Sequence, residues 1–157
     1  MRIALGSDHA GITLKNELKR AFDKVASGDN PLHTCIDVGT YTEKSVDYPE
    51  IAQQVAEGVA TSTFDRGILV CGSGIGMSIA ANKVAGVRAA LIHDVDSARL
   101  CREHNDANVI ALAGRTLDTD TAMSIVKVFL ETNFEGGRHQ RRLQRITEIE
   151  QQPKGKP

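Results

Sequence analysis

The chain has no marked excess of charge and no long hydrophobic run. Its 19 Lys and Arg residues and 20 Asp and Glu residues leave a formal net charge of −1. A protein that gathers nucleic acid by charge alone is strongly basic. Apolar stretches such as residues 67–77 and 84–92 are interrupted by glycine or charge, and they fall well short of the ~20 residues that span a bilayer. We therefore expect neither nucleic acid nor a membrane as a partner.

Cysteine is also scarce. The three cysteines form no C-x-x-C pair, which argues against a disulfide framework and against a cysteine-based zinc site. The first residues lack the apolar stretch of a signal peptide, so we expect a protein of the reducing cytoplasm.

A length of 157 residues suits one domain whose core needs no structural metal. We assign residues 1–150 to this domain and residues 151–157 to a disordered polar tail.

Short apolar segments alternate with longer segments of helical period. The predicted strands are residues 2–6, 34–38, 67–71, 87–92 and 108–113. Their apolar residues run almost continuously, which is typical of strands covered on both faces. The predicted helices contain residues 14–25, 51–59, 79–84, 98–100, 122–130 and 143–149, and a loop is expected at residues 26–31. This alternation predicts an α/β fold: a three-layer α/β/α sandwich around a Rossmann-like five-stranded parallel sheet.

Polar or glycine-rich residues directly follow four of the predicted strands. Because the carboxyl ends of parallel strands meet at one edge of a sheet, we expect these residues to share a cleft. They are Ser7-Asp8-His9, Cys71-Gly72-Ser73-Gly74-Ile75-Gly76, His93-Asp94 and Gly114-Arg115.

The glycine-rich turn is the strongest local signal. Such a turn between a strand and a helix lets backbone N–H groups point into one concavity, where a phosphate or an oxyanion can bind. Helix N-termini favour the thiolate form of cysteine, so Cys71 is a candidate base or nucleophile; the alternative is a tight turn with a buried cysteine. The dinucleotide fingerprint fails in register, since Met77 stands where its third glycine would be, and no Gly-Lys-Ser or Gly-Lys-Thr indicates a P-loop.

Other polar residues have both a catalytic and a structural interpretation. Asp8 and His9 could polarise a sugar hydroxyl, whereas Asp8 could equally cap the following helix. His104 could act as an acid near neutral pH or lie on the surface. Arg138 and Arg142, four residues apart, share a helix face and could clamp a phosphate; the alternative is a solvated basic patch.

The remaining candidates are interpreted as structural. Arg141 and Arg145 fit the solvated patch, and Cys35 and Cys101 fit small residues that pack inside the protein. His93 and His104 each have an aspartate nearby but no third converging ligand in the sequence, so no metal site is expected.

Six motifs in order resemble the ribose-5-phosphate isomerase B family, which includes the galactose-6-phosphate isomerase subunits. The resemblance extends from residue 3 to about residue 150. Its motifs are Gly6-Ser7-Asp8-His9-Ala10-Gly11, Val46-Asp47-Tyr48-Pro49, Cys71-Gly72-Ser73-Gly74-Ile75-Gly76, Ile79-Ala80-Ala81-Asn82-Lys83, His104-Asn105-Asp106-Ala107-Asn108-Val109 and Glu135-Gly136-Gly137-Arg138-His139.

The resemblance implies interconversion of ribose 5-phosphate and ribulose 5-phosphate through a cis-enediol(ate), without metal or cofactor. Cys71 would move a proton between C2 and C1, and the backbone of residues 72–76 with Ser73 would hold the oxyanion. His104 would open the furanose ring. The substrate contacts implied in addition are Asp8, His9, Asn105 and Arg115, with Arg138 and Arg142 at the phosphate. A branch of the family has a glutamate where this chain has Met77, so the cysteine branch is the better match.

The resemblance also implies a homodimer whose active sites take residues from both chains, with pairing of dimers into tetramers left open. The size of the sugar is open too: a tetrose phosphate of the erythrulose phosphate type and galactose 6-phosphate are alternatives. Tyr48, Ser73 and the residues flanking His93 are candidates for the contacts that decide between them. A non-catalytic sugar-phosphate-binding module is the alternative from another class, because a fold alone does not determine a function.

Overall fold

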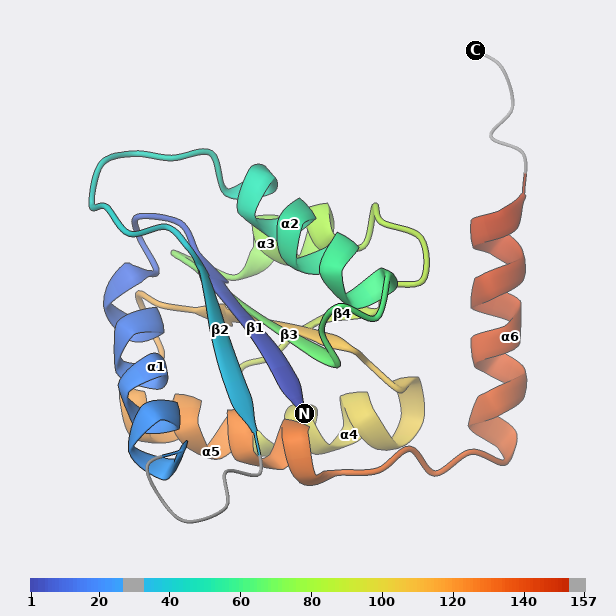
Figure 1. Ribbon diagram of the computed structural model, residues 1–157. Helices are drawn as coiled ribbons and strands as arrows, with labels where there is room; N and C mark the ends of the chain where they lie inside the picture. Colours follow the sequence, from blue (N-terminus) through green and yellow to red (C-terminus); the bar gives the residue numbers. More distant parts are fainter. Residues whose placement is uncertain (27–32, 153–157) are drawn as a thin grey trace.

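The computed structural model describes residues 1–26 and 33–152, and these form a parallel sheet covered by helices (Figure 1). The strands are β1 (Arg2–Ser7), β2 (Thr34–Gly39), β3 (Arg66–Cys71), β4 (Ala89–Leu91) and β5 (Val109–Ala113). They pair in parallel in the order β2-β1-β3-β5-β4. The predicted five-stranded parallel sheet is therefore confirmed, although the fourth strand is shorter than expected.

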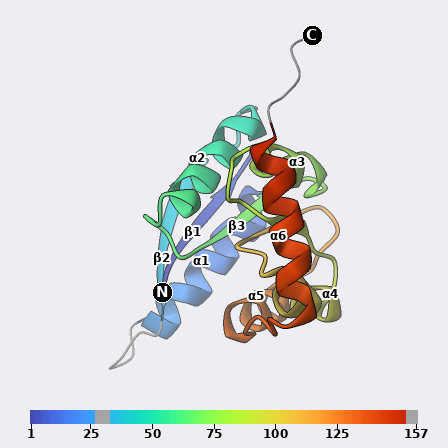
Figure 2. The ribbon, with the colours of Figure 1, turned by 90° about the vertical axis from the view of Figure 1, so that its right-hand side faces the viewer.

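The helices form two layers on the sheet and one element outside it. They are α1 (Ile12–Ala26), α2 (Tyr48–Ala60), α3 (Ile75–Ala81), α4 (Val95–Asn105), α5 (Thr119–Glu131) and α6 (Arg138–Gln151). Helices α2 and α3 cover one face of the sheet, and α1, α4 and α5 cover the other, which confirms the predicted sandwich (Figure 1). Helix α6 stands outside these layers beside α4, a position visible in both views (Figures 1 and 2).

The sheet separates two hydrophobic cores because successive side chains of a strand point to opposite faces. In β3, Ile68 and Val70 join the core under α1, α4 and α5, whereas Leu69 and Cys71 join the core under α2 and α3. Cys101 is buried in the first core and Cys35 packs against it, as the sequence predicts.

Several predicted boundaries shift in the structure. Helix α3 begins at Ile75, within the glycine-rich segment, instead of four residues later. Helix α6 reaches Gln151, where the polar tail was expected to begin. Most of the expected loop and tail, residues 27–31 and 153–157, lies outside the described residues. Within residues 1–26 and 33–152, no helix is long and apolar enough to cross a membrane.

Candidate active site

A hollow of about 240 Å³ lies at the carboxyl ends of β1, β3 and β5. The residues after these three strands therefore meet, as their positions in the sequence indicate. The hollow is lined by Asp8, His9, Ala10, Tyr48, Cys71, Gly72, Ser73, Gly76 and Arg115.

The residues after β4 do not line this hollow, so their expected place in the cleft is wrong. Asp94 instead caps α4: its Oδ1 accepts a hydrogen bond from the Ser97 amide at 2.7 Å. The residues flanking His93 are likewise absent from the lining. The physical reason is that β4 is a short strand at the sheet edge, next to β5 and distant from β1.

Asp8 shapes the turn that leads from β1 into α1. Its Oδ1 accepts hydrogen bonds from the amides of Ala10 and Gly11, both at 2.9 Å. These amides precede the first residue of α1, so Asp8 has a structural role in the turn and not as the expected cap of the helix. The turn packs tightly on β3, because a Cβ at Gly11 would lie 2.5 Å from the Val70 carbonyl oxygen. Asp8 lines the hollow while only 7% exposed, and its structural role is compatible with a contact to substrate.

His9 is oriented by the segment between β2 and α2. Its Nδ1 accepts a hydrogen bond from the Val46 amide at 3.3 Å, which leaves the proton of the neutral ring on Nε2 as a donor. The beginning of the same segment is tied to α1 by the fully buried Lys15, whose Nζ donates to Asp37 Oδ2 at 2.7 Å and to the Thr40 carbonyl at 2.9 Å. This buried ion pair thus helps to hold the segment that orients His9.

Cys71 ends β3 with its thiol at the glycine-rich turn. The Gly74 amide lies 3.1 Å from Sγ and can donate a hydrogen bond to it. Gly74 has a φ of 75°, and a Cβ there would lie 2.5 Å from Leu91 Cδ1, so glycine is required at this position. The Gly74 amide thus helps to fix the position of the sulfur at the hollow.

Two further glycines let large polar side chains close over this turn. A Cβ at Gly76 would lie 2.6 Å from Tyr48 Cζ, and a Cβ at Gly72 would lie 3.2 Å from Arg115 Nε. The absence of side chains at these positions therefore makes room for a phenol and a guanidinium beside Cys71.

A second group of predicted site residues gathers where α4 ends and α6 begins. The rings of His104 and His139 stack with their centroids 4.2 Å apart and their planes 5° apart. Arg138 Nε donates to His139 Nε2 at 3.2 Å. Burial, and then the charges of His104, Arg138 and Arg142, lower the pKa of His139. His139 is thus held as a neutral ring against His104.

His139 has no assigned role in the sequence analysis. The signal that could have indicated one is its position directly after Arg138, four residues beyond Glu135 and three before Arg142. On a helix such spacings place side chains close together.

The same group contains the one set of three possible metal ligands found among residues 1–26 and 33–152. The ligand atoms of His104, Glu135 and His139 all lie within 4.8 Å of one another, so the expectation that His104 lacks further converging ligands is wrong. However, the Nε2 lone pair of His139 already accepts from Arg138, and nearby guanidinium groups repel a cation. The geometry therefore suits an anion better than a metal ion.

The two groups lie at opposite edges of the sheet within one chain. His104 precedes β5 and Arg115 follows it, and a strand of 5 residues is about 16 Å long at ~3.3 Å per residue. The hollow is lined by none of His104, Asn105, Arg138 and Arg142. The structure thus brings the candidate residues together as two half-sites: the hollow around Cys71, and the group of His104, Asn105, Arg138 and Arg142.

The three cysteines should differ in reactivity toward an alkylating reagent. Burial raises the pKa of Cys35 to about 12 and that of Cys101 to about 11, so both thiols stay protonated at neutral pH. We expect iodoacetamide to modify Cys71 first, because its thiol lines the hollow. Peptide mass spectrometry measures the three rates, and faster modification of Cys35 or Cys101 would contradict this expectation.

Comparison with known proteins places the chain in a family. The sequence profile of the Ribose/Galactose Isomerase family matches residues 3–146. Ribose-5-phosphate isomerase B of Escherichia coli is 46% identical over 150 residues, which is 96% of this chain and 97% of the relative. A Bacillus subtilis relative named only as a sugar phosphate isomerase is also 46% identical, over 96% of this chain and 98% of its own.

Solved structures agree with these relatives. Ribose-5-phosphate isomerase B of Clostridium thermocellum superposes with a TM-score of 0.90 at 47% identity, covering 96% of this chain and 97% of its own. The Mycoplasma genitalium enzyme with bound ribulose-5-phosphate superposes with a TM-score of 0.88 at 40% identity, covering 97% of each chain. The fold and the relatives are those of a sugar phosphate isomerase. The chain belongs to the Ribose/Galactose Isomerase family.

Proposed function

We propose that this protein interconverts ribose 5-phosphate and ribulose 5-phosphate by proton transfer through a cis-enediol(ate). The observation that carries the proposal is the position of Cys71, which lines the hollow and accepts a hydrogen bond from the Gly74 amide on its sulfur. The Cys71 thiolate removes the proton from C2 of the open-chain aldose and returns a proton to C1. Meanwhile the carbonyl oxygen at C1 becomes an enediolate oxygen, which the amides of the glycine-rich turn stabilise. The hydroxyl proton on O2 passes to this oxygen, so that C1 carries the hydroxyl and C2 the carbonyl of the ketose. The reverse steps convert the ketose, and neither direction needs a cofactor.

The second half-site supplies ring opening and phosphate binding in this proposal. His104 gives a proton to the ring oxygen, Asn105 contacts the sugar, and Arg138 and Arg142 bind the phosphate by charge-assisted hydrogen bonds. Because β5 separates the half-sites of one chain, His104 must come from a second copy of this chain. A homodimer with shared active sites follows.

Exposed apolar side chains support such a second copy. Ile75 and Ile79 on α3 are 51% and 56% exposed, and Ile146 and Ile149 on α6 are 47% and 68% exposed. Apolar side chains grouped on two helices in this way often mark a protein interface. Association in a dimer would cover them.

Ribose 5-phosphate is favoured as the substrate by the relatives. The Mycoplasma genitalium structure holds ribulose-5-phosphate, and the relative from Escherichia coli is named for ribose 5-phosphate. The family description also includes galactose, so a hexose phosphate is the second candidate, with a tetrose phosphate beside it. Tyr48 closes one side of the hollow and is the residue we expect to limit the length of the sugar.

Proton NMR of ribulose 5-phosphate in D₂O with the purified protein tests this proposal. We expect ribose 5-phosphate to appear with deuterium at C2, since a thiol exchanges its proton with solvent. Product without deuterium would contradict an exchanging thiol. Absence of product, together with turnover of a tetrose or hexose phosphate, would show an isomerase of another specificity. Binding without turnover of any of these sugars would show a non-catalytic module.

Replacing Arg142 with alanine should chiefly raise KM. Hydrogen bonds to charged groups contribute about 1.5–3 kcal/mol, so the loss of one phosphate contact should raise KM roughly 10- to 100-fold, with a smaller change in kcat. Arg141→Ala is the matched control, because it removes a neighbouring exposed guanidinium that the proposal does not use. Equal effects of the two variants on KM would show that the helix acts only as a diffuse positive surface.

A further inference from the structure

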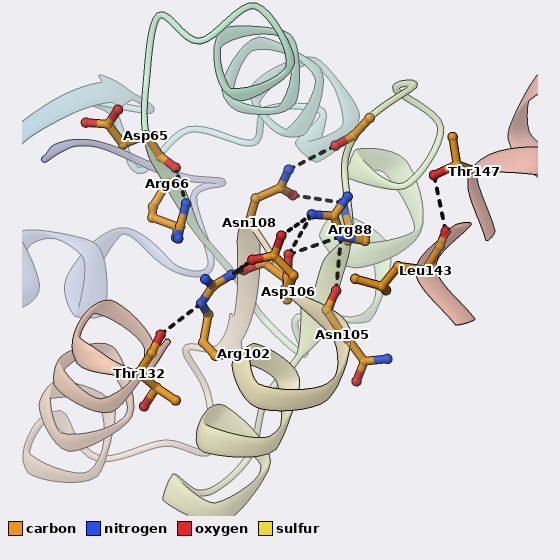
Figure 3. Close-up of polar contacts among 12 residues, drawn as sticks. Asp65, Arg66, Arg88, Arg102, Asn105, Asp106, Asn108, Thr132, Leu143 and Thr147 are labelled. Atoms are coloured by element: carbon orange, nitrogen blue, oxygen red, sulfur yellow. Dashed lines mark hydrogen bonds and ion pairs between the residues drawn. The ribbon is translucent and has the colours of Figure 1, made fainter. Parts of the chain in front are cut away.

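The last turn of α4, which carries His104 and Asn105, is clamped by residues that belong to neither half-site. Figure 3 shows Asp106 between two guanidinium groups, that of Arg88 just before β4 and that of Arg102 on α4. The carboxylate accepts from both: Asp106 Oδ2 lies 2.9 Å from Arg88 Nη2, and Oδ1 lies 2.8 Å from Arg102 Nη1.

Arg88 holds the end of the helix through the main chain. Its Nε donates to the carbonyl oxygens of Asn105 and Asp106, both at 3.0 Å, and its Nη2 donates to the Asp106 carbonyl at 2.8 Å. Carbonyl groups at a helix C-terminus have no partner within the helix, so a guanidinium in this place satisfies them. The main chain next to His104 is thereby bonded to the start of the edge strand.

Arg102 ties the same turn to the segment that leads into α6. It is only 3% exposed, and its Nε donates to the Thr132 carbonyl at the end of α5, at 3.3 Å. Its Nη1 also donates to the Ala107 carbonyl. One buried guanidinium therefore connects the end of α4 with the segment between α5 and Arg138, so that both parts of the second half-site share an anchor.

The backbone at Asp106 shows how sharply the helix is stopped. Asp106 adopts a φ of 44° and a ψ of 43°, a left-handed conformation in which aspartate and asparagine are tolerated better than most residues. The chain turns here, directly after Asn105, and enters β5 at Val109.

We propose that Asp106, clamped between Arg88 and Arg102, is a positioning residue that fixes the last turn of α4 and so presents His104 and Asn105 to the sugar in the partner subunit. The inference rests on the proposed function. It goes beyond that function because Asp106 does not line the hollow, and its carboxylate bonds to Arg88 and Arg102, through which it fixes the main chain next to His104.

The test compares a step that needs His104 with a step that does not. Turnover of ribose 5-phosphate requires ring opening. Exchange of solvent deuterium into C1 of ribulose 5-phosphate does not, because this ketose carries its phosphate on the oxygen that would close the ring and is always an open chain. Both rates are measured at saturating sugar phosphate in D₂O, with the dimer confirmed by its mass in solution.

Asp106→Asn keeps the shape of the side chain and its tolerance of the left-handed conformation while removing the charge. We expect ribose 5-phosphate turnover to fall roughly 10- to 100-fold, as for a misplaced catalytic group, with little change in deuterium exchange. If loss of the carboxylate beside the buried Arg102 prevents folding, the test uses the Arg88→Gln variant instead. This variant leaves the ion pair of Asp106 and Arg102 intact. The matched control is Arg99→Gln, which removes exposed ion pairs with Asp96 and Glu103 on the same helix and should leave both rates unchanged.

Each other outcome of this experiment contradicts either the inference or the proposed function. An equal fall of both rates would show that the clamp maintains only fold or assembly, and unchanged rates in both variants would show that the turn needs no clamp; either result overturns the inference. If the unsubstituted protein performs neither reaction, the proposed function itself fails. This result differs from the two that overturn only the inference.

Discussion

Replacing Cys71 with alanine should lower kcat for ribose 5-phosphate by about 10³-fold or more, because the variant lacks the proposed base. Cys71 lines the hollow, and its sulfur accepts a hydrogen bond from the Gly74 amide. Deuterium exchange into C1 of ribulose 5-phosphate should be lost to the same extent. Binding of the sugar phosphate should persist, because the proposed phosphate contacts lie in the other half-site. Calorimetric titration measures this binding.

Cys35→Ala is the matched control for this variant. Cys35 lies on β2 and packs against the core instead of lining the hollow, so turnover should remain at the level of the unsubstituted protein. Full activity of Cys71→Ala would contradict the assignment of the base. Loss of sugar-phosphate binding along with activity would indicate that the substitution deforms the glycine-rich turn.

Mixing two inactive variants should restore activity. In Cys71→Ala dimers each site lacks the base, and in His104→Ala dimers each site lacks the ring-opening acid. In the proposed shared site Cys71 comes from one chain and His104 from the other, so a mixed dimer of these chains would contain one site with both intact residues. After refolding of an equal mixture, half of the dimers are mixed, so we expect about one quarter of the activity of the unsubstituted protein.

The assay is turnover of ribose 5-phosphate before and after joint refolding, with each variant refolded alone as the control. Mass measurement of differently tagged chains gives the fraction of mixed dimers. If mixed dimers form and activity does not return, both residues act within one chain, and the shared site is refuted. This result would require a rearrangement of α4, since β5 now keeps the two residues apart.

Local features of this protein follow from the sequence. The near-continuous apolar strands predict a sheet covered on both faces, and α2 with α3 on one side and α1 with α4 and α5 on the other confirm it. The hollow around Cys71 also follows from the sequence, because residues after adjacent parallel strands must meet at one edge of the sheet. Turn and strand propensities depend on neighbours along the chain, which is why these features could be predicted.

Long-range contacts required the tertiary structure. The approach of Tyr48 to Gly76 and of Arg115 to Gly72, and the stack of His104 on His139, join residues whose spacing along the chain carries little information on distance. The clamp on Asp106 likewise depends on how β4 and α5 pack around the end of α4.

The division into half-sites shows the difference most clearly. The sequence by itself determined which residue types occur and which end of a strand or helix each occupies. Only the tertiary structure decided that Cys71 and His104 lie at opposite edges of the sheet, because a parallel strand order requires α4 to run back across the sheet before β5 begins. As a result, His104 at the end of α4 lies where the strands begin, whereas Cys71 lies where β3 ends.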